Sequence, residues 1–139
     1  MLRVALDTDV IVAARRSRTG ASNRLLGELR MGRLVAVASV GMMVEYEAVL
    51  KRPDMLRAMR ASMEDVDGFL DALAVLIVPV TPHFLWRPVL RDPADEMVLD
   101  AAVCGGAEAI VTFNGRDFLP GAGRFGVAVL SPAETLRRL

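Results

Sequence analysis

Cysteine and histidine are nearly absent from this sequence, with one of each among 139 residues. A lone Cys104 excludes an intrachain disulfide and leaves a cysteine-based zinc site without its ligands. A lone His83 likewise excludes most histidine-dependent catalysis and most zinc or non-haem iron sites. Because structural disulfides belong to oxidising compartments, their exclusion favours the cytoplasm as the location of this protein.

An excess of one charge is also lacking, since 17 basic residues balance 17 acidic ones. This balance argues against a protein that coats nucleic acid by bulk charge alone. All basic residues except Lys51 are Arg, so the sequence still allows a local arginine patch. The codon composition of the source genome would explain the same preference for Arg over Lys. Hydrophobic residues make up 53% of the chain, which is enough for a buried core and excludes a disordered chain.

Long hydrophobic runs are missing as well. The longest apolar stretch, residues 73–80, falls far short of the roughly 20 residues that a membrane-spanning helix needs. Asp7 and Asp9 interrupt the apolar run at the N-terminus, which makes it unsuitable as the core of a signal peptide. We therefore expect no association with a membrane.

Short apolar segments alternate with amphipathic ones along the chain. The segments expected as buried strands are residues 2–7, 34–38, 75–80, 109–113 and 127–130. The segments expected as helices are residues 10–15, 21–31, 39–50, 62–74, 92–104 and a short stretch after Ser131. Strands that are apolar throughout and alternate with helices indicate a parallel sheet covered on both faces. The sequence predicts one α/β domain over residues 1–139, a three-layer α/β/α sandwich with a mainly parallel central sheet.

Several helix starts carry side chains that can accept hydrogen bonds from the first free amides of a helix. Ser62 has the spacing of a capping box with the residues that follow it. Asp92 followed by Pro93 is a strong start signal, because the first helical position does not need the N–H that proline lacks. At the first helix we expect Thr8 or Asp9 to act as the cap.

Four acidic residues fall where they could share one crevice. Ligands of open α/β sheets bind beyond the carboxyl ends of the strands. Asp7 ends one expected strand, and Asp117 follows another. Asp95 lies in the first turn of its helix, a position that the helix dipole also favours for a carboxylate. Glu45 borders the apolar face of its helix, which is unusual for a charged residue unless it is paired or bound to a metal. Each residue alone has an ordinary structural explanation, but together they indicate one acidic site.

A site built from carboxylates, without cysteine or a usable histidine, suits Mg²⁺ or Mn²⁺. Such a cluster fits the hydrolysis of phosphodiester bonds, because one or two divalent ions activate water and stabilise the leaving oxygen. No side chain has to act as the nucleophile in this chemistry. The residues themselves therefore predict a metal-dependent hydrolase acting on a phosphodiester.

Three segments of the chain resemble the motifs of PIN-domain ribonucleases. These segments are Leu6 to Val12, Arg91 to Glu96, and Ile110 to Phe118. The resemblance covers essentially the whole chain, in the order and spacing of the family, and is closest to the toxins of type II toxin–antitoxin systems, similar to VapC toxins. The first and last segments together are fairly specific, whereas either alone would be a weak signal.

The resemblance implies a PIN-like fold and a Mg²⁺- or Mn²⁺-dependent endoribonuclease. It also implies a homodimer, and a cognate antitoxin whose tail blocks the active site. The catalytic and metal-binding acids of the family correspond to Asp7, Glu45, Asp95 and Asp117. Thr112 and Asn114 match the T-x-N-x-x-D ending of the family, where they would orient a metal-bound water or Asp117. The antitoxin would contact the Met- and Leu-rich helices before and after Pro53.

One residue departs from the family pattern, because Asp9 stands where Asn is common. This carboxylate could add a metal ligand, raise the pKa of a neighbouring acid, or cap the helix as Asn would; we favour capping. Contact with RNA must come from basic residues near the crevice. Arg15 and Arg116 are the candidates, since arginine pairs bidentately with phosphate, although a solvated surface charge explains each of them equally well.

Two readings from other functional classes compete with a nuclease. Asp7 and Asp9 also resemble the D-x-D opening of haloacid-dehalogenase phosphatases, but that chemistry needs a lysine near the phosphate, and Lys51 has no fitting motif around it. A PIN-like interaction module without catalysis is the second reading, and the presence of all four acids argues against it. A PIN nuclease that acts on DNA or structured RNA outside any toxin system shares the same site and differs only in its substrate.

Overall fold

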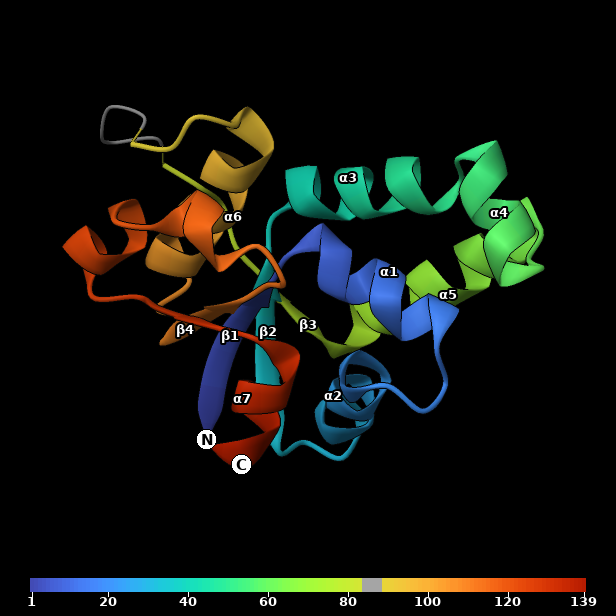
Figure 1. Cartoon of the computed structure of the whole chain (residues 1–139), viewed down its shortest axis with the longest axis horizontal. Coiled ribbons are helices and arrows are strands. Elements are labelled where there is room, and N and C mark those ends of the chain that lie inside the picture. Colours follow the sequence, from blue (N-terminus) through green and yellow to red (C-terminus); the bar gives the residue numbers. More distant parts are fainter. Residues whose placement is uncertain (84–88) are drawn as a thin grey trace.

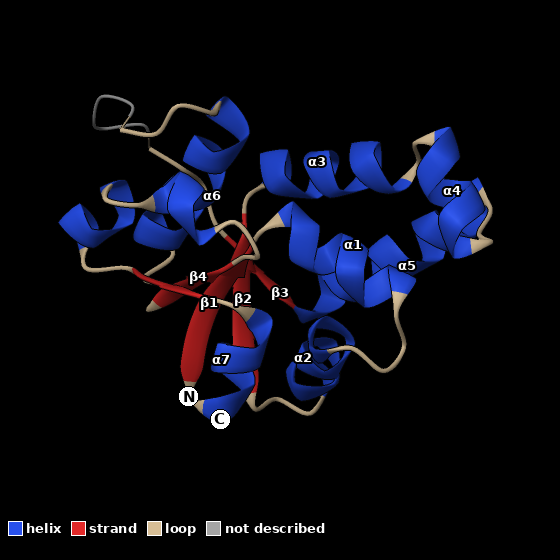
Figure 2. Cartoon of the chain, viewed as in Figure 1, coloured by secondary structure: helices blue, strands red, loops and turns tan. Residues whose placement is uncertain are grey.

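The computed structural model describes residues 1–83 and 89–139. The proline-rich loop that the sequence predicts before Asp92 lies partly outside the described residues. Within them, five strands form one sheet in the order β3-β2-β1-β4-β5, and every neighbouring pair is parallel (Figure 2). The strands are β1 (Leu2–Leu6), β2 (Leu34–Ala38), β3 (Ile77–Pro79), β4 (Ala109–Val111) and β5 (Ala128–Leu130).

Seven α-helices and two short 3₁₀-helices connect the strands in the described part of the chain (Figure 1). The α-helices are α1 (Thr8–Arg16), α2 (Ala21–Arg30), α3 (Val40–Leu50), α4 (Pro53–Met59), α5 (Met63–Leu76), α6 (Pro93–Cys104) and α7 (Pro132–Arg137). The 3₁₀-helices are η1 (Gly115–Phe118) and η2 (Gly121–Phe125). None of these described helices is both long and apolar enough to cross a bilayer.

The strand order determines how the helices are layered. The chain moves outward from β1 through β2 to β3, and then returns across the sheet to β4 and β5. Because crossovers between parallel strands are right-handed, this reversal places the helices between β1 and β3 on one face and α6 on the other. The predicted α/β/α sandwich with a parallel sheet is confirmed.

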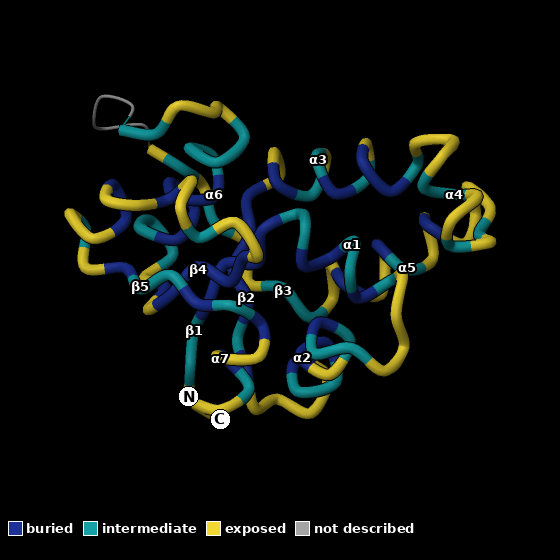
Figure 3. The backbone as a smooth tube through the Cα atoms, viewed as in Figure 1, coloured by how far each residue is buried: buried dark blue, intermediate teal, exposed yellow. Residues whose placement is uncertain are grey.

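The core follows from the apolar strands that the sequence contains. Val4, Ala5 and Leu6 of β1 are at most 1% exposed, as expected for the central strand of a sheet covered on both faces. Figure 3 shows the buried backbone concentrated in the central strands, whereas α4 is largely exposed. A Cβ at Gly105 would lie 2.8 Å from the carbonyl oxygen of Ala101, so glycine lets the end of α6 approach the sheet closely.

The N-cap residues that the sequence predicts are confirmed at most of these helices. Ser39 accepts a hydrogen bond from the amide of Met42, and the Ser62–Asp65 capping box is complete. Asp92 accepts from the amide of Ala94. The predicted cap of the first helix is wrong. Its N-cap is Asp7 and not Thr8 or Asp9, and the Asp7 carboxylate accepts a hydrogen bond from the amide of Thr8.

Two further corrections concern the region between β2 and β3. The predicted strand at residues 75–80 is only Ile77–Pro79, because α5 continues to Leu76. An apolar run of this length is compatible with a helix and with a strand. In the structure Leu73 is buried as part of the helix, while Val75 is 85% exposed. Pro53 does more than end a helix, since it occupies the first turn of α4, an element that the sequence did not predict.

Candidate active site

Asp7 directly follows β1, at the carboxyl edge of the sheet. Its backbone amide donates to the carbonyl of Val111 at the end of the neighbouring strand β4. One carboxylate oxygen accepts from the Thr8 amide at 2.9 Å, and the other accepts from the Thr112 hydroxyl at 2.8 Å. Burial raises the pKa of Asp7 against the effect of these hydrogen bonds, and the charge of Asp117 adds to the rise. The edge position that the sequence predicted for Asp7 is therefore the observed one.

Asp9 lies beside Asp7 and holds the loop that follows β4. Its Oδ2 accepts from the amide of Phe113 and from the side-chain amide of Asn114, each at 3.0 Å. Its Oδ1 is buried and has no hydrogen-bond partner in the described residues. Burial, followed by the charge of Asp7, raises the pKa of Asp9 to about 6. Asp9 therefore ties two distant segments together and leaves one carboxylate oxygen free, which a simple capping role does not explain.

Thr112 and Asn114 connect the two halves of this site. The buried Thr112 hydroxyl donates to Asp7 and accepts from the backbone amide of Asn114 at 2.9 Å. Asn114 in turn accepts through its carbonyl oxygen from the amide of Asp117 at 3.0 Å, at the start of η1. These two residues therefore contact the acidic residues directly, and the loop that carries Asp117 is fixed to β1 and α1.

Asp95 and Asp117 complete the group of acids on this edge. Asp95 lies in the first turn of α6 and is partly exposed, while Asp117 lies exposed on η1. Burial raises the pKa of Asp95 to about 6, and the charges of Asp7, Asp92, Asp117 and Asp9 contribute in that order. Four carboxylates from three separate segments thus create a negative potential that no neighbouring base neutralises by an ion pair among the described residues. We call Asp7, Asp9, Asp95 and Asp117 the acidic cluster.

A pocket of about 520 Å³ opens beside this cluster. Its lining includes Leu90, Arg91, Asp92, Asp95, Arg116 and Asp117. Arg116 lies next to Asp117 here, which is where the sequence predicted a contact to a phosphate. Arg91 and Asp92 were not predicted as site residues, although their position in the Arg91–Glu96 segment was a usable signal.

Glu45 is the one predicted metal ligand for which the described residues show no contact with the acidic cluster. It is partly buried on α3, and its carboxylate makes no hydrogen bond or ion pair among residues 1–83 and 89–139. Its charge is also not among those that raise the pKa of Asp7, Asp9 or Asp95. Its neighbour Tyr46 is fully buried and donates its hydroxyl to the carbonyl of Leu6. This contact fixes α3 at the end of β1, one residue away from Glu45.

The fit of a divalent cation can be judged from the donors themselves. The described residues contain no group of three or more Asp, Glu, His or Cys side chains already arranged around one point. Mg²⁺ does not require such a cage, because it binds through one or two carboxylates together with waters and substrate phosphates. The mutual repulsion within the acidic cluster and the unpartnered Oδ1 of Asp9 both favour a cation. The donor set therefore fits Mg²⁺ or Mn²⁺.

Two residues lie far from this site. Arg15 is near the C-terminal end of α1, and its guanidinium carbon is 4.6 Å from the centre of the Phe69 ring. It lines a different pocket from Arg116. Lys51 is the C-cap of α3 and pairs with Glu47 and Asp67. The phosphatase alternative, which needs a lysine beside Asp7, therefore has no support.

Comparisons with known proteins show the family and the fold of this chain. The family model for the PIN domain matches residues 3–116. A similar solved structure is the crystal structure of VapBC2 from Rickettsia felis bound to a DNA fragment from their promoter. The match has a TM-score of 0.61 and 14% sequence identity, and it covers 94% of this chain and 98% of that one. At this identity the likeness establishes the fold. No curated protein matches the sequence significantly.

Proposed function

Since the chain belongs to the PIN-domain family, a family of nucleases, we propose that it is a metal-dependent endoribonuclease and the toxin of a toxin–antitoxin pair. The observation that carries this proposal is the acidic cluster at the carboxyl edge of the sheet. Burial and mutual repulsion raise the pKa of Asp9 and Asp95 to about 6. Carboxylates that repel one another in this way are stabilised by a bound cation.

Asp7, Asp95 and Asp117 would hold Mg²⁺ or Mn²⁺ in this proposal, and Glu45 is retained as a fourth ligand on the strength of the family resemblance. The bound ion would activate water and stabilise the leaving oxygen of the phosphodiester. Thr112 keeps Asp7 in place through its hydroxyl, because that hydroxyl donates directly to the carboxylate. Arg116 lines the adjacent pocket, and in this proposal it would pair with a phosphate of the RNA.

The toxin assignment rests on the resemblance of the three sequence segments to VapC toxins, and the likeness of the fold to VapBC2 is consistent with it. A cognate antitoxin, a homodimer and a cytoplasmic location are parts of this proposal. An interaction module that lacks catalysis is the second candidate, because the described residues contain no preformed group of three metal ligands. The two candidates differ in whether the folded protein cuts RNA.

The experiment that tests the proposal is cleavage of a mixed RNA pool by the purified protein, with Mg²⁺, with Mn²⁺ and with EDTA. The same assay is run on Asp7→Asn, which keeps a capping side chain at the start of α1, and on Asp71→Asn, whose carboxylate is exposed on α5. We expect metal-dependent cutting that falls at least about a hundredfold in Asp7→Asn, because even supporting residues of metal sites contribute ten- to a hundredfold. Asp71→Asn should cut like the unmodified protein.

A folded sample that cuts no RNA with either metal would contradict the proposal and favour the interaction module. Cleavage that persists in EDTA, or in Asp7→Asn at the unmodified rate, would show that the site is wrongly assigned. A duplex DNA substrate run in parallel separates a ribonuclease from a deoxyribonuclease, since both would use the same acids.

A further inference from the structure

Phe113 is the one exposed aromatic residue in the part of the chain that the structure describes, and it is 55% exposed. Aromatic residues make up only 5% of the sequence. Among the described ones, Tyr46 and Phe118 are buried in the core, and the guanidinium of Arg15 lies over the ring of Phe69. A single exposed apolar side chain is common and needs no explanation by itself. The place where Phe113 is held is what gives its ring a meaning.

The backbone around Phe113 is fixed to the acidic cluster on both sides of the ring. The amide of Phe113 itself donates to Oδ2 of Asp9 at 3.0 Å. The preceding Thr112 donates its hydroxyl to Asp7 at 2.8 Å, and the following Asn114 donates its side-chain amide to Asp9 at 3.0 Å. An exposed ring on an anchored loop is already ordered, so a ligand that contacts it loses little free energy in fixing it.

The same loop carries Arg116, which is exposed and makes no ion pair among residues 1–83 and 89–139. Arg116 lines the pocket of about 520 Å³ together with Asp95 and Asp117. The amide of Asp117 donates to the carbonyl of Asn114 at 3.0 Å, so the turn that carries Arg116 is tied to the residue after Phe113. A flat apolar ring and an unpaired guanidinium therefore belong to one fixed loop beside the acids. A nucleotide needs these two groups, since aromatic rings stack on bases and arginine pairs with phosphate.

We propose that Phe113 is the base-stacking residue of the RNA site, and that it holds one unpaired base while Arg116 pairs with a neighbouring phosphate. This inference rests on the proposed nuclease function and names its substrate class, which is single-stranded RNA. Bases inside a duplex are already stacked on one another, so their faces are not free for the ring. The chain has no net positive charge, so bulk charge does not hold the strand. Stacking supplies an attraction that does not depend on charge.

A protein partner is a poorer occupant of the Phe113 ring. Aromatic residues that dominate protein interfaces lie in well-packed pockets from which water is excluded. The exposed residues that follow Phe113 in its loop are Asn114, Arg116 and Asp117, which are polar or charged. Stacking covers only a face of the ring and leaves these neighbours in water, so a base suits the surroundings of Phe113 better than an apolar protein surface does.

The test is an NMR titration of protein labelled with ¹³C-phenylalanine, in which the ring signals of Phe113 report stacking directly. These signals are assigned by their loss in Phe113→Leu. All samples contain Mg²⁺ and carry Asp7→Asn, so that the RNA stays uncut. The probe is single-stranded octauridylate, and its matched control is an abasic octamer with the same phosphates. We expect octauridylate to shift the Phe113 signals upfield in a saturable way and to bind at least about tenfold more tightly than the abasic octamer.

Variants of the protein separate stacking from general apolar contact. Phe113→Leu keeps an apolar side chain and the amide bonded to Asp9 but removes the aromatic face, so it should weaken binding of octauridylate about tenfold or more. Phe113→Trp keeps an aromatic face and should bind as tightly as the parent. Val75→Ala, which shortens an apolar residue that is 85% exposed on α5, is the control and should bind normally. A short blunt RNA duplex should leave the Phe113 signals unshifted.

Four results would overturn the proposal. These are Phe113 signals that do not move, equal affinity for octauridylate and the abasic octamer, an equal loss of affinity in Phe113→Leu and Val75→Ala, and a duplex that shifts the Phe113 signals as strongly as the single strand. The nuclease proposal fails separately. If the unmodified protein cuts no RNA and Asp7→Asn still stacks octauridylate on Phe113, only the nuclease is wrong. Metal-dependent cutting without any shift of Phe113 overturns the stacking role alone.

Discussion

The two ends of α1 carry opposite charges, and each end has a polar atom that finds no hydrogen-bond partner among the described residues. At the N-terminal end this atom is the buried Oδ1 of Asp9, and at the C-terminal end it is the buried Nε of Arg15. The helix dipole favours an anion at the first end and a cation at the second. It does not remove the charge at either end.

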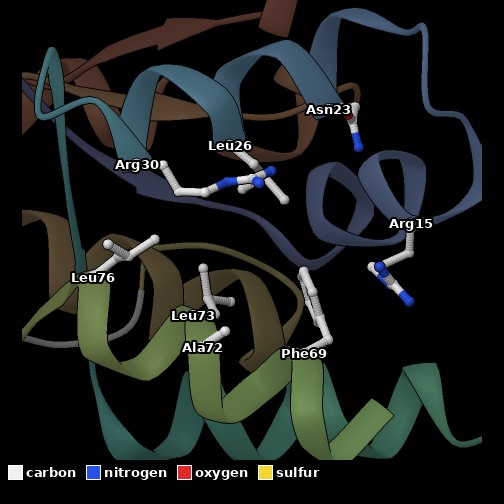
Figure 4. A pocket seen from close by; sticks show the side chains of 8 residues that line it. All are labelled: Arg15, Asn23, Leu26, Arg30, Phe69, Ala72, Leu73 and Leu76. Atoms are coloured by element: carbon white, nitrogen blue, oxygen red, sulfur yellow. The ribbon is translucent and has the colours of Figure 1, made fainter. Parts of the chain in front are cut away.

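The surroundings of the two ends also differ. The acidic end is held by hydrogen bonds between β1, α1 and the loop after β4, and it opens on a polar pocket of about 520 Å³. The basic end lies against apolar side chains in a pocket of about 200 Å³. A hydrated cation with a phosphodiester fits the first. At the second, the guanidinium of Arg15 lies over the ring of Phe69, and both side chains line the pocket (Figure 4). The two ends of one helix therefore differ in charge and in surroundings.

Among the variants that test the difference between the two ends, Glu45→Gln is expected to have the largest effect on cleavage. If Glu45 belongs to the acidic end, as the proposal holds, cleavage should fall at least about a hundredfold, as for other residues of a metal site. Glu47→Gln is the matched control, because Glu47 lies two residues from Glu45 on the same helix and its carboxylate pairs with Lys51. The measurement is kcat/KM on one RNA substrate. Equal rates for the two variants would remove Glu45 from the site.

Thr112→Val should have the next largest effect. It removes the hydroxyl that donates to Asp7 and accepts from the amide of Asn114, so we expect a loss of about ten- to a hundredfold in kcat/KM. The lost hydrogen bonds should also lower the free energy of unfolding by about 1–3 kcal/mol.

Thr135→Val is the control for stability alone, because this buried hydroxyl donates to the carbonyl of Ser131 on α7, away from the acidic cluster. It should lower the thermal midpoint and leave cleavage unchanged. If Thr112→Val lost no more activity than Thr135→Val, Thr112 would have only a structural role.

Asp9→Asn tests the repulsion at the acidic end through its pH dependence. The folded-state pKa of Asp9 is about 6, above the value of about 3.9 in an unfolded chain. The folded protein therefore binds more protons between these values, and its stability falls as the pH rises from about 4 to about 6. Asn at this position stays neutral, so the variant should gain a few degrees in thermal midpoint at pH 7 and almost nothing at pH 4.

The measurement is thermal unfolding in EDTA at both pH values, and Asp71→Asn, an exposed acid on α5, is the control that should show no such difference. Addition of Mg²⁺ should reduce the gain, because a bound cation relieves the same repulsion. A variant that is equally stabilised at pH 4 and pH 7 would contradict a charge effect.

Ala72→Trp is expected to have no effect on cleavage. The substitution fills the pocket between α1, α2 and α5, which shares no lining residue with the pocket beside Asp95 and Asp117. The measurement is kcat/KM on the same RNA, together with a circular dichroism spectrum to confirm folding. A loss of activity in a folded variant would show that the two ends of α1 are coupled.

Much of the fold and part of the site could be predicted because they depend on local patterns. The strand at Leu34–Ala38 has the bounds expected from its apolar run, and Ser39, Ser62 and Asp92 cap their helices as their spacing indicated. The edge position of Asp7 also followed from the sequence, since a parallel sheet places its ligand sites beyond its strand ends. The end of α5 was misplaced, because an apolar run does not distinguish a helix from a strand by itself.

The sequence by itself determined that this chain forms a parallel α/β sheet and that Asp7 lies at the carboxyl edge of that sheet, because strand periodicity and helix caps act between residues near in the chain. Only the tertiary structure decided that Asp9 joins α1 to the loop of Phe113 and Asn114, and that Arg15 stacks on Phe69 instead of facing the acids. These contacts join residues more than 50 positions apart, and they depend on which helix faces pack together. No local pattern encodes that packing, so the acidic end of α1 could be predicted and its arginine end could not.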